Sequence, residues 1–353
     1  MNKEKRYKYL PLAETGRLSE SDTKKYFSTL GYAVSAFLLA TLGASLVISV
    51  ICQSRFPWVL ENDILSNIIS LICQYGIGLP ALLAVLSKLP KDVNPKEKLG
   101  FGRFMGFFCL SITFMTVGSN ISSSLMSGIE ELLGRSVANP VDTMTASSHW
   151  AVNIVFYVII APVLEELVFR KIVCDRLLPM GELTAVILSA ALFGLSHGNF
   201  YQFFYAFFVG AIFSYIYIKT GSVIYTMIMH IMINLICGIF APWLYGEIAP
   251  LLTEEFWLTV SELAANGDLN GFIDLIRPFS LPFSLVMLYS TVMNAFSIVG
   301  FVLLMKNLRR IRFADGLLRP AKENIVSNFF LNGGVCSAIA LFVGAFIISL
   351  FAK

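Results

Sequence analysis

The chain has 353 residues, of which 56% are hydrophobic and only 14% charged, and its formal net charge at pH 7 is +3. A soluble domain carries about 25% charged residues, so this deficit and a mean hydropathy of +0.73 exclude an ordinary soluble protein. The apolar runs are continuous and do not alternate, which excludes a transmembrane β-barrel. The composition therefore predicts an all-α, polytopic helical membrane protein with about eight to nine transmembrane helices.

The apolar segments are taken in chain order. Residues 1–28 are polar and basic and contain no hydrophobic run, so we expect a tail without a cleavable signal peptide. Nine apolar segments follow, of which the fifth is short: 30–52, 64–87, 104–126, 150–178, 183–197, 202–218, 222–245, 282–305 and 328–351. They divide the chain into five expected regions: the tail 1–28, N-terminal transmembrane helices 29–146, a core 147–245, an acidic loop 246–281 and C-terminal transmembrane helices 282–353.

The basic residues predict the orientation. All but four of the 26 lysines and arginines fall on alternate loops of one side; the exceptions are Arg55, Arg135, Arg277 and Lys353. Because cytoplasmic loops are enriched in Lys and Arg, we expect the N-terminus to be cytoplasmic and the acidic loop 246–281 to lie on the other side. That loop contains a predicted amphipathic helix near 253–265. The basic tail predicts contact with anionic membrane lipids, and nothing in the sequence indicates nucleic-acid binding.

The fourth apolar segment contains three ionisable side chains. Glu165, Glu166 and Arg170 lie within an otherwise apolar run, although a carboxylate at that depth costs roughly 2.5–3.5 kcal/mol. Glu166 and Arg170 are spaced i,i+4 with the acid first, so we expect them to form a supporting ion pair. Glu165 points about 100° away from Glu166 and needs a partner from another helix.

Two histidines and an asparagine supply polar groups at similar depth. Glu165 and His197 both lie roughly 23–25 Å from the turn at 179–181, so an antiparallel hairpin sets them level. His230 and Asn234 share one helix face because they are four residues apart. If the next hairpin lies somewhat higher, all four side chains meet in one layer.

This constellation predicts general-base catalysis. A carboxylate paired with an imidazole can deprotonate water, and we expect His197 to be the partner of Glu165. His230 and Asn234 can stabilise an oxyanion, and together these groups suit peptide hydrolysis. Three alternatives to a peptidase remain. The polar side chains could serve only in helix packing, or the protein could be a proton-coupled membrane transporter, or it could be a non-catalytic membrane scaffold or immunity protein. The transporter reading lacks the expected internal repeat.

The motifs also resemble a known family. Glu-Glu-x-x-x-Arg at 165–170, Phe193-x-x-x-His197 and His230-x-x-x-Asn234 are similar, in the same order, to the motifs of the CPBP intramembrane proteases, which include CAAX-prenyl endopeptidases and bacteriocin-immunity-like proteins. The resemblance covers about 150–240 and makes 147–245 the expected protease core. It implies a glutamic-type endopeptidase in which Glu165 and His197 activate water, with His230 and Asn234 at the oxyanion.

The resemblance also bears on cofactors, substrates and location. The sequence has no His-Glu-x-x-His, so we expect no cofactor; if zinc were bound, Glu165, His197 and His230 would be its ligands. The expected substrate is a hydrophobic or lipidated peptide. The expected location is the bacterial plasma membrane, where processing of prenylated, bacteriocin or surface peptides fits equally well.

Overall fold

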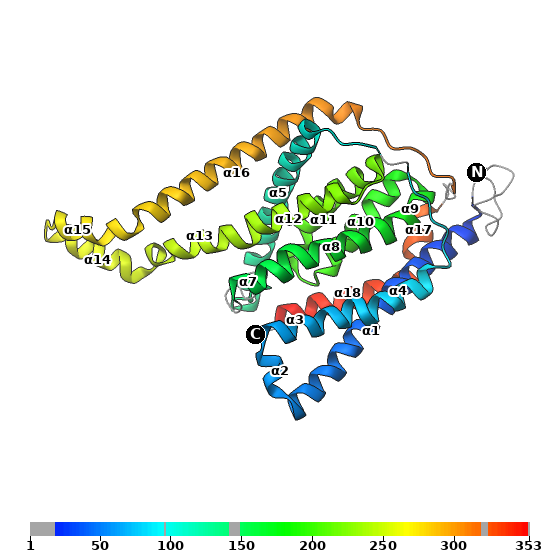
Figure 1. The fold of residues 1–353 in the computed structure, drawn as a ribbon, viewed down its shortest axis with the longest axis horizontal. Helices are drawn as coiled ribbons and strands as arrows, with labels where there is room; N and C mark the ends of the chain where they lie inside the picture. Colours follow the sequence, from blue (N-terminus) through cyan, green and yellow to red (C-terminus); the bar gives the residue numbers. More distant parts are fainter. Residues whose placement is uncertain (1–17, 95–96, 141–148, 319–323, 352–353) are drawn as a thin grey trace.

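The computed structural model describes residues 18–94, 97–140, 149–318 and 324–351, and the regular elements in these ranges are all helices (Figure 1). Within these ranges, eight helices are long and apolar enough to cross a membrane: Glu20–Arg55, Asp63–Leu86, Phe101–Leu133, Trp150–Met180, Phe200–Thr220, Ile224–Leu251, Leu269–Arg310 and Gly333–Phe351. A ninth apolar helix, α10 (Glu182–Ser196), is shorter. The predicted all-α polytopic membrane fold is confirmed, and the short fifth segment is α10.

Several helix ends lie away from the predicted boundaries. Helix α1 (Glu20–Arg55) begins ten residues before the predicted 30–52 segment, because the Ser19 side chain caps it and Tyr26 and Phe27 are buried in the core. The last predicted segment, 328–351, is divided between α17 (Ile325–Phe330) and α18 (Gly333–Phe351). Hydropathy alone does not detect these ends, because they are set by caps and tertiary packing.

Three of the long helices contain a π-helical segment directly before a proline. These are η2 (Ile72–Gly78), η3 (Ile154–Ile160) and η6 (Asn234–Phe240), which lead into α4 (Leu79–Leu86), α8 (Ala161–Glu166) and α13 (Ala241–Ile248). A proline inside an α-helix lacks a donor and clashes with the carbonyl four residues earlier. The backbone N–H of the residue before each proline instead donates to the carbonyl oxygen five residues back, as Ala161 does to Phe156. The wider turn lets the helix continue through the proline.

The centre of the bundle is formed by α8, α10, α11 (Phe200–Thr220) and α12 (Ile224–Ile233), together with η4 (Leu167–Cys174). Helix α5 (Phe101–Leu133) packs against α11 and α16 (Ser280–Asn307), while α1 packs against α4 and α18. The approach of α11 to α5 depends on Gly118, where a Cβ would lie 2.4 Å from the Cα of Tyr205. Small residues permit such close helix packing in membranes.

Helices α13 and α16 pack together through Leu244, Ile248 and Val286 and extend away from the rest of the bundle (Figure 1). Helices α14 (Glu254–Ala265) and α15 (Leu269–Ile276) lie at the far end of this pair. The helix predicted near 253–265 is therefore present. Much of the segment predicted as an acidic loop, 246–281, is helical.

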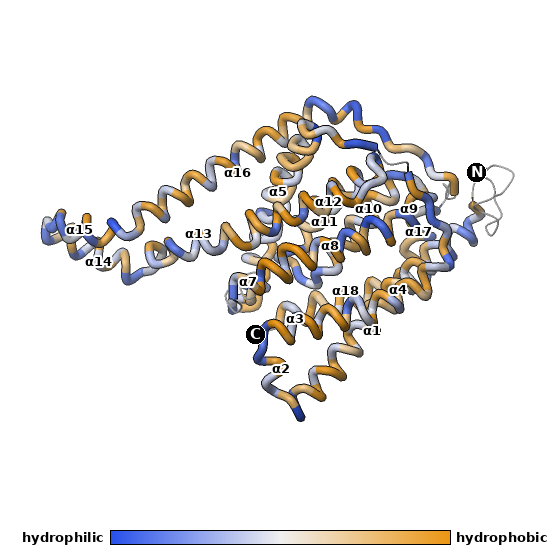
Figure 2. Tube along the Cα trace, viewed as in Figure 1, coloured by the Kyte–Doolittle hydropathy of each residue, from blue (hydrophilic) through white to orange (hydrophobic). Residues whose placement is uncertain are grey.

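The basic loops meet at one end of the bundle. Three backbone N–H groups donate to backbone carbonyl oxygens in other segments of the chain. That of Asp92 donates to Asp175, that of Glu97 to Thr220, and that of Glu182 to Ala314. These bonds join four loops that the distribution of lysine and arginine assigned to one side. Figure 2 shows polar residues concentrated in these loops and at the tip formed by α14 and α15, with apolar helices between them.

Candidate active site

The predicted site residues lie on five neighbouring helical elements. Glu165 and Glu166 end α8, Arg170 lies in η4, His197 caps the end of α10, and His230 lies in α12. Asn234, the sixth predicted residue, begins η6. Helix α8 contacts α12, η4 contacts α10, and η3 contacts η6. The two hairpins therefore pack against each other at the level of these residues.

Glu166 and Arg170 form the predicted ion pair. The Nε and Nη2 atoms of Arg170 lie 3.0 and 3.3 Å from the two carboxylate oxygens of Glu166, and neither side chain is exposed. Arg170 Nη1 also donates to the hydroxyls of Ser189 and Ser214, at 3.1 and 3.2 Å. Its guanidinium carbon lies 4.9 Å from the centre of the Phe193 ring. This bidentate, hydrogen-bonded geometry is what a buried ion pair requires to offset desolvation.

His230 connects the two glutamates. Its Nδ1 lies 3.2 Å from a carboxylate oxygen of Glu166, and its Nε2 lies 3.7 Å from Glu165 Oε2. Phe193 and Phe213 flank the imidazole, with ring centres 5.6 and 5.7 Å away. Because Glu166 can only accept at Nδ1 while ionised, it fixes the proton of His230 on that nitrogen and turns Nε2 toward Glu165. Glu166 thus orients His230 in addition to pairing with Arg170.

The two adjacent glutamates differ in access to water. The Glu166 side chain is fully buried, whereas 26% of the Glu165 side chain is exposed. Glu165 also lies within electrostatic range of His197, Tyr75 and Tyr205. Of the two carboxylates, Glu165 is therefore the one that solvent can reach.

His197 is held by its own helix. Its Nδ1 lies 2.9 Å from the carbonyl oxygen of Phe193, so Nδ1 carries the hydrogen of that bond and Nε2 is left to accept one. The expectation of a direct Glu165–His197 pair differs from what the structure describes. Across the described part of the chain, the imidazole within ion-pair distance of Glu165 belongs to His230. His197 lies farther off because the Phe193 bond anchors its ring to the end of α10.

Asn234 lies one helical turn after His230 and joins α12 to the helix that carries the glutamates. Its Nδ2 donates to the carbonyl oxygen of Tyr157 at 2.9 Å, and the Tyr157 hydroxyl donates to Asn67 at 2.8 Å. Tyr157 lies in η3, where the wider π-helical turn leaves carbonyl groups outside the ordinary α-helical pattern. The side-chain NH₂ group of Asn234 has two hydrogens, and the bond to Tyr157 uses one of them.

Several residues near the site were not predicted from the sequence. Ser189 and Ser214 complete the shell around Arg170, and the sequence signal for them is a lone hydroxyl in an apolar helix. Asn199 donates to the His197 carbonyl at 2.8 Å and to Gln202 at 2.9 Å, while Gln202 donates to the Tyr205 hydroxyl at 3.0 Å. This chain of bonds fixes the turn after His197, and only the tertiary structure reveals it.

The zinc ligands considered from the sequence do not converge. Over the described residues, no group of three or more His, Cys, Asp or Glu side chains lies close enough to hold a metal ion. His197 is set back from Glu165, since the imidazole within ion-pair distance of that carboxylate belongs to His230. The side chains as arranged do not fit a His₂Glu zinc site.

Fold and site together define a polytopic helical membrane protein with glutamates, histidines and an asparagine gathered among its central helices. Residues 147–236 match the family described as type II CAAX prenyl endopeptidase Rce1-like. The matched region contains all six predicted site residues. This match supports a membrane-bound peptidase. Comparison with curated proteins and with solved structures gave no match.

Proposed function

We propose that this protein is an intramembrane endopeptidase that hydrolyses peptide bonds of membrane-associated or lipidated peptides. The observation that supports the proposal is the difference in environment between the two adjacent glutamates. Glu166 is buried and bonded to Arg170 and His230, whereas Glu165 is partly exposed and faces His230 Nε2 at 3.7 Å. The match of residues 147–236 to a CAAX endopeptidase family favours a peptide bond as the target.

The proposed reaction uses water as the nucleophile. Glu165, assisted by His197 Nε2, takes a proton from a water molecule while the water oxygen attacks the scissile carbonyl carbon. The carbonyl oxygen becomes an oxyanion, stabilised by Asn234 and by His230 when its Nε2 is protonated. The C–N bond then breaks, and the proton held by Glu165 passes to the leaving amine. No step requires a metal ion.

The burial of the site indicates the substrate class. Glu165, His197 and His230 lie among apolar helices with Phe193 and Phe213 around them, so the scissile bond must enter from a peptide already at the membrane. Prenylated CAAX peptides, hydrophobic bacteriocin-type peptides and surface-protein precursors all meet this requirement. We propose the bacterial plasma membrane, with the basic loops on the cytoplasmic side, as the place of action.

The test is cleavage by purified protein in detergent and in liposomes. Matched prenylated and unprenylated CAAX peptides are compared with a library of hydrophobic peptides, and products are identified by mass spectrometry. We expect Glu165→Gln to lower kcat by about 10²–10⁴-fold, as removal of a general base does. Glu247→Gln, a change of the same type outside the central helices, serves as control and should retain the parental rate. Full cleavage by both Glu165→Gln and His197→Ala would refute the mechanism. If the protein cuts nothing but moves solute in a pH-dependent way, the transporter reading replaces it.

Metal dependence is tested separately. Since the side chains do not fit a His₂Glu zinc site, we expect cleavage to survive dialysis against a strong chelator, with less than one zinc per chain by elemental analysis. Loss of activity on chelation, restored by zinc alone, would contradict this expectation.

A further inference from the structure

A pocket separate from the catalytic residues lies at the end of the bundle where the basic loops meet. It has a volume of about 360 Å³ and is lined by Ser87, Leu89, Pro90, Lys91, Val93 and Arg176. These residues come from the loop after α4 and from α9 (Asp175–Leu177), so the pocket lies where two membrane-crossing helices end. Its volume falls within the roughly 300–1,000 Å³ range of small-ligand sites. Arg176 is 11 residues from Glu165, roughly 16 Å along the helix, so the pocket is distinct from the proposed active site.

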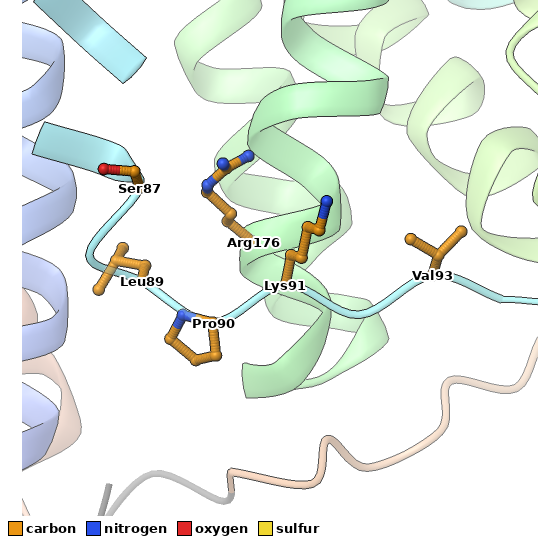
Figure 3. A pocket seen from close by; sticks show the side chains of 6 residues that line it. All are labelled: Ser87, Leu89, Pro90, Lys91, Val93 and Arg176. Atoms are coloured by element: carbon orange, nitrogen blue, oxygen red, sulfur yellow. The ribbon is translucent and has the colours of Figure 1, made fainter. Parts of the chain in front are cut away.

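Two cationic side chains extend toward the same side of the loop (Figure 3). Arg176 is held in place by two hydrogen bonds to backbone carbonyl oxygens. Its Nε donates to that of Leu86 and its Nη1 to that of Ile172, both at 3.0 Å. These bonds leave the Nη2 group available. Lys91 is exposed, and the described part of the chain contains no ion pair to it. A fixed guanidinium and a mobile ammonium together can surround a phosphate group.

The nearby acids leave the pocket with a positive balance. Asp175 lies within electrostatic range of Lys91 and Arg176, but its carboxylate is paired with Lys171 at 3.1 Å and also accepts from the Tyr217 hydroxyl. Asp92, which follows Lys91, accepts from the backbone N–H of Val93. The pocket therefore favours an anionic ligand.

The remaining lining is apolar. Leu89 is buried, while Pro90 and Val93 border the opening. A free inorganic anion gains nothing from such groups, whereas an amphipathic molecule can place its phosphate at the cations and its glycerol and acyl chain against the apolar side chains. Basic pockets between helices at the cytoplasmic face of a membrane are suited to anionic lipid headgroups.

We propose that this pocket binds the phosphate headgroup of an anionic membrane lipid, with Arg176 and Lys91 as its ligands. This inference does not depend on the proposed peptidase activity. Occupancy ties the loop after α4 to α9 at the end of the helix that carries Glu165.

The experiment measures lipid binding to the full-length protein by native mass spectrometry. Phosphatidylglycerol and phosphatidylcholine with identical acyl chains are titrated separately. Lys91→Gln is compared with Lys88→Gln, a matched control that removes an exposed charge three residues away but does not line the pocket. Lysine is varied because Arg176 also bonds to Leu86 and Ile172, so its removal would alter the fold. Thermal melting of both variants confirms comparable stability.

We expect phosphatidylglycerol to bind more tightly than phosphatidylcholine, and Lys91→Gln to weaken it about fivefold while Lys88→Gln leaves it unchanged. Equal affinity for the two lipids, or equal losses in the two variants, would overturn the proposal. A third arm adds inorganic phosphate. If millimolar phosphate displaces the lipid and binds with the same sensitivity to Lys91→Gln, the site is one for free phosphate and the lipid assignment is wrong.

Discussion

At the residue scale, the site is organised by a charge network and not by one catalytic pair. Arg170 neutralises Glu166, Glu166 orients His230, and His230 faces Glu165. Each of these polar groups is surrounded by apolar helices and is satisfied by the next residue in the network. Loss of one residue therefore leaves its neighbour without a partner. The two adjacent glutamates of the sequence thus differ in the structure: Glu166 is buried and paired with Arg170, whereas the Glu165 carboxylate is accessible to solvent.

The ion pair leads to a prediction about stability. Arg170→Met leaves the buried Glu166 carboxylate without its bidentate partner, so we expect a loss of about 3–5 kcal/mol in the free energy of unfolding. The double variant Glu166→Gln/Arg170→Met removes both charges and should recover part of that loss. Denaturation of the parent, Arg170→Met, Glu166→Gln and the double variant in the same detergent measures the coupling. Additive effects would mean that the two side chains do not stabilise each other.

A second residue-scale prediction concerns Glu166 and His230. Glu166→Gln replaces an acceptor-only carboxylate with an amide that can present either its oxygen or its NH₂ group to His230 Nδ1, so the ring should exchange between tautomers. We expect kcat to fall while KM changes little, because His230 is proposed to act on the oxyanion and not on substrate binding. The ¹⁵N shifts of labelled His230 would report the tautomer directly. An unchanged tautomer together with an unchanged kcat would rule out this orienting role.

At the element scale, prolines and glycines set the positions of the helices. Pro162 follows the π-helical segment η3 and lies three residues before Glu165, so the wide turn contributes to the rotation at which the glutamates leave α8. Gly118 brings α11 against α5, and Gly300 brings α16 against α5, where a Cβ would lie 2.4 Å from the Cys109 carbonyl oxygen. Helix register thus rests on a few backbone contacts.

Gly118 and Gly128 form a matched pair on α5. A methyl group at Gly118 meets the backbone of Tyr205, whereas one at Gly128 meets nothing within 4 Å. We expect Gly118→Ala to destabilise by about 1–3 kcal/mol through overpacking. Gly128→Ala should stabilise by roughly 0.5–1 kcal/mol, because alanine favours the helix. Thermal unfolding in detergent compares them, and equal shifts would show that α5 and α11 can move apart without cost.

At the scale of the whole molecule, polar loops gather at one end and the tip of α14 and α15 lies away from them. Backbone hydrogen bonds between loops of the basic end hold four connections together. The pair formed by α13 and α16 extends away from the bundle and carries exposed aromatic side chains such as Trp243 and Phe283. The asymmetry of charge between the two ends is the physical basis for the proposed orientation.

Orientation is tested by cysteine labelling in intact cells. In a Cys336→Ser background, which removes the exposed native thiol, Thr253→Cys should react with a membrane-impermeant maleimide. Lys88→Cys should react only after the membrane is permeabilised, because it lies at the basic end. The reverse pattern would place the basic loops outside.

The sequence by itself determined the helical membrane fold, the Glu166–Arg170 pair and the set of residues from which the site is built. These features depend on hydropathy and on i,i+4 spacing, which are local properties of a helix. The tertiary structure alone decided that His230, and not His197, lies nearest to Glu165, that Ser189 and Ser214 complete the shell around Arg170, and that Lys91 and Arg176 share a pocket. Those contacts join residues on different helices, and their geometry depends on π-helical turns, glycine contacts and loop hydrogen bonds that no local pattern encodes.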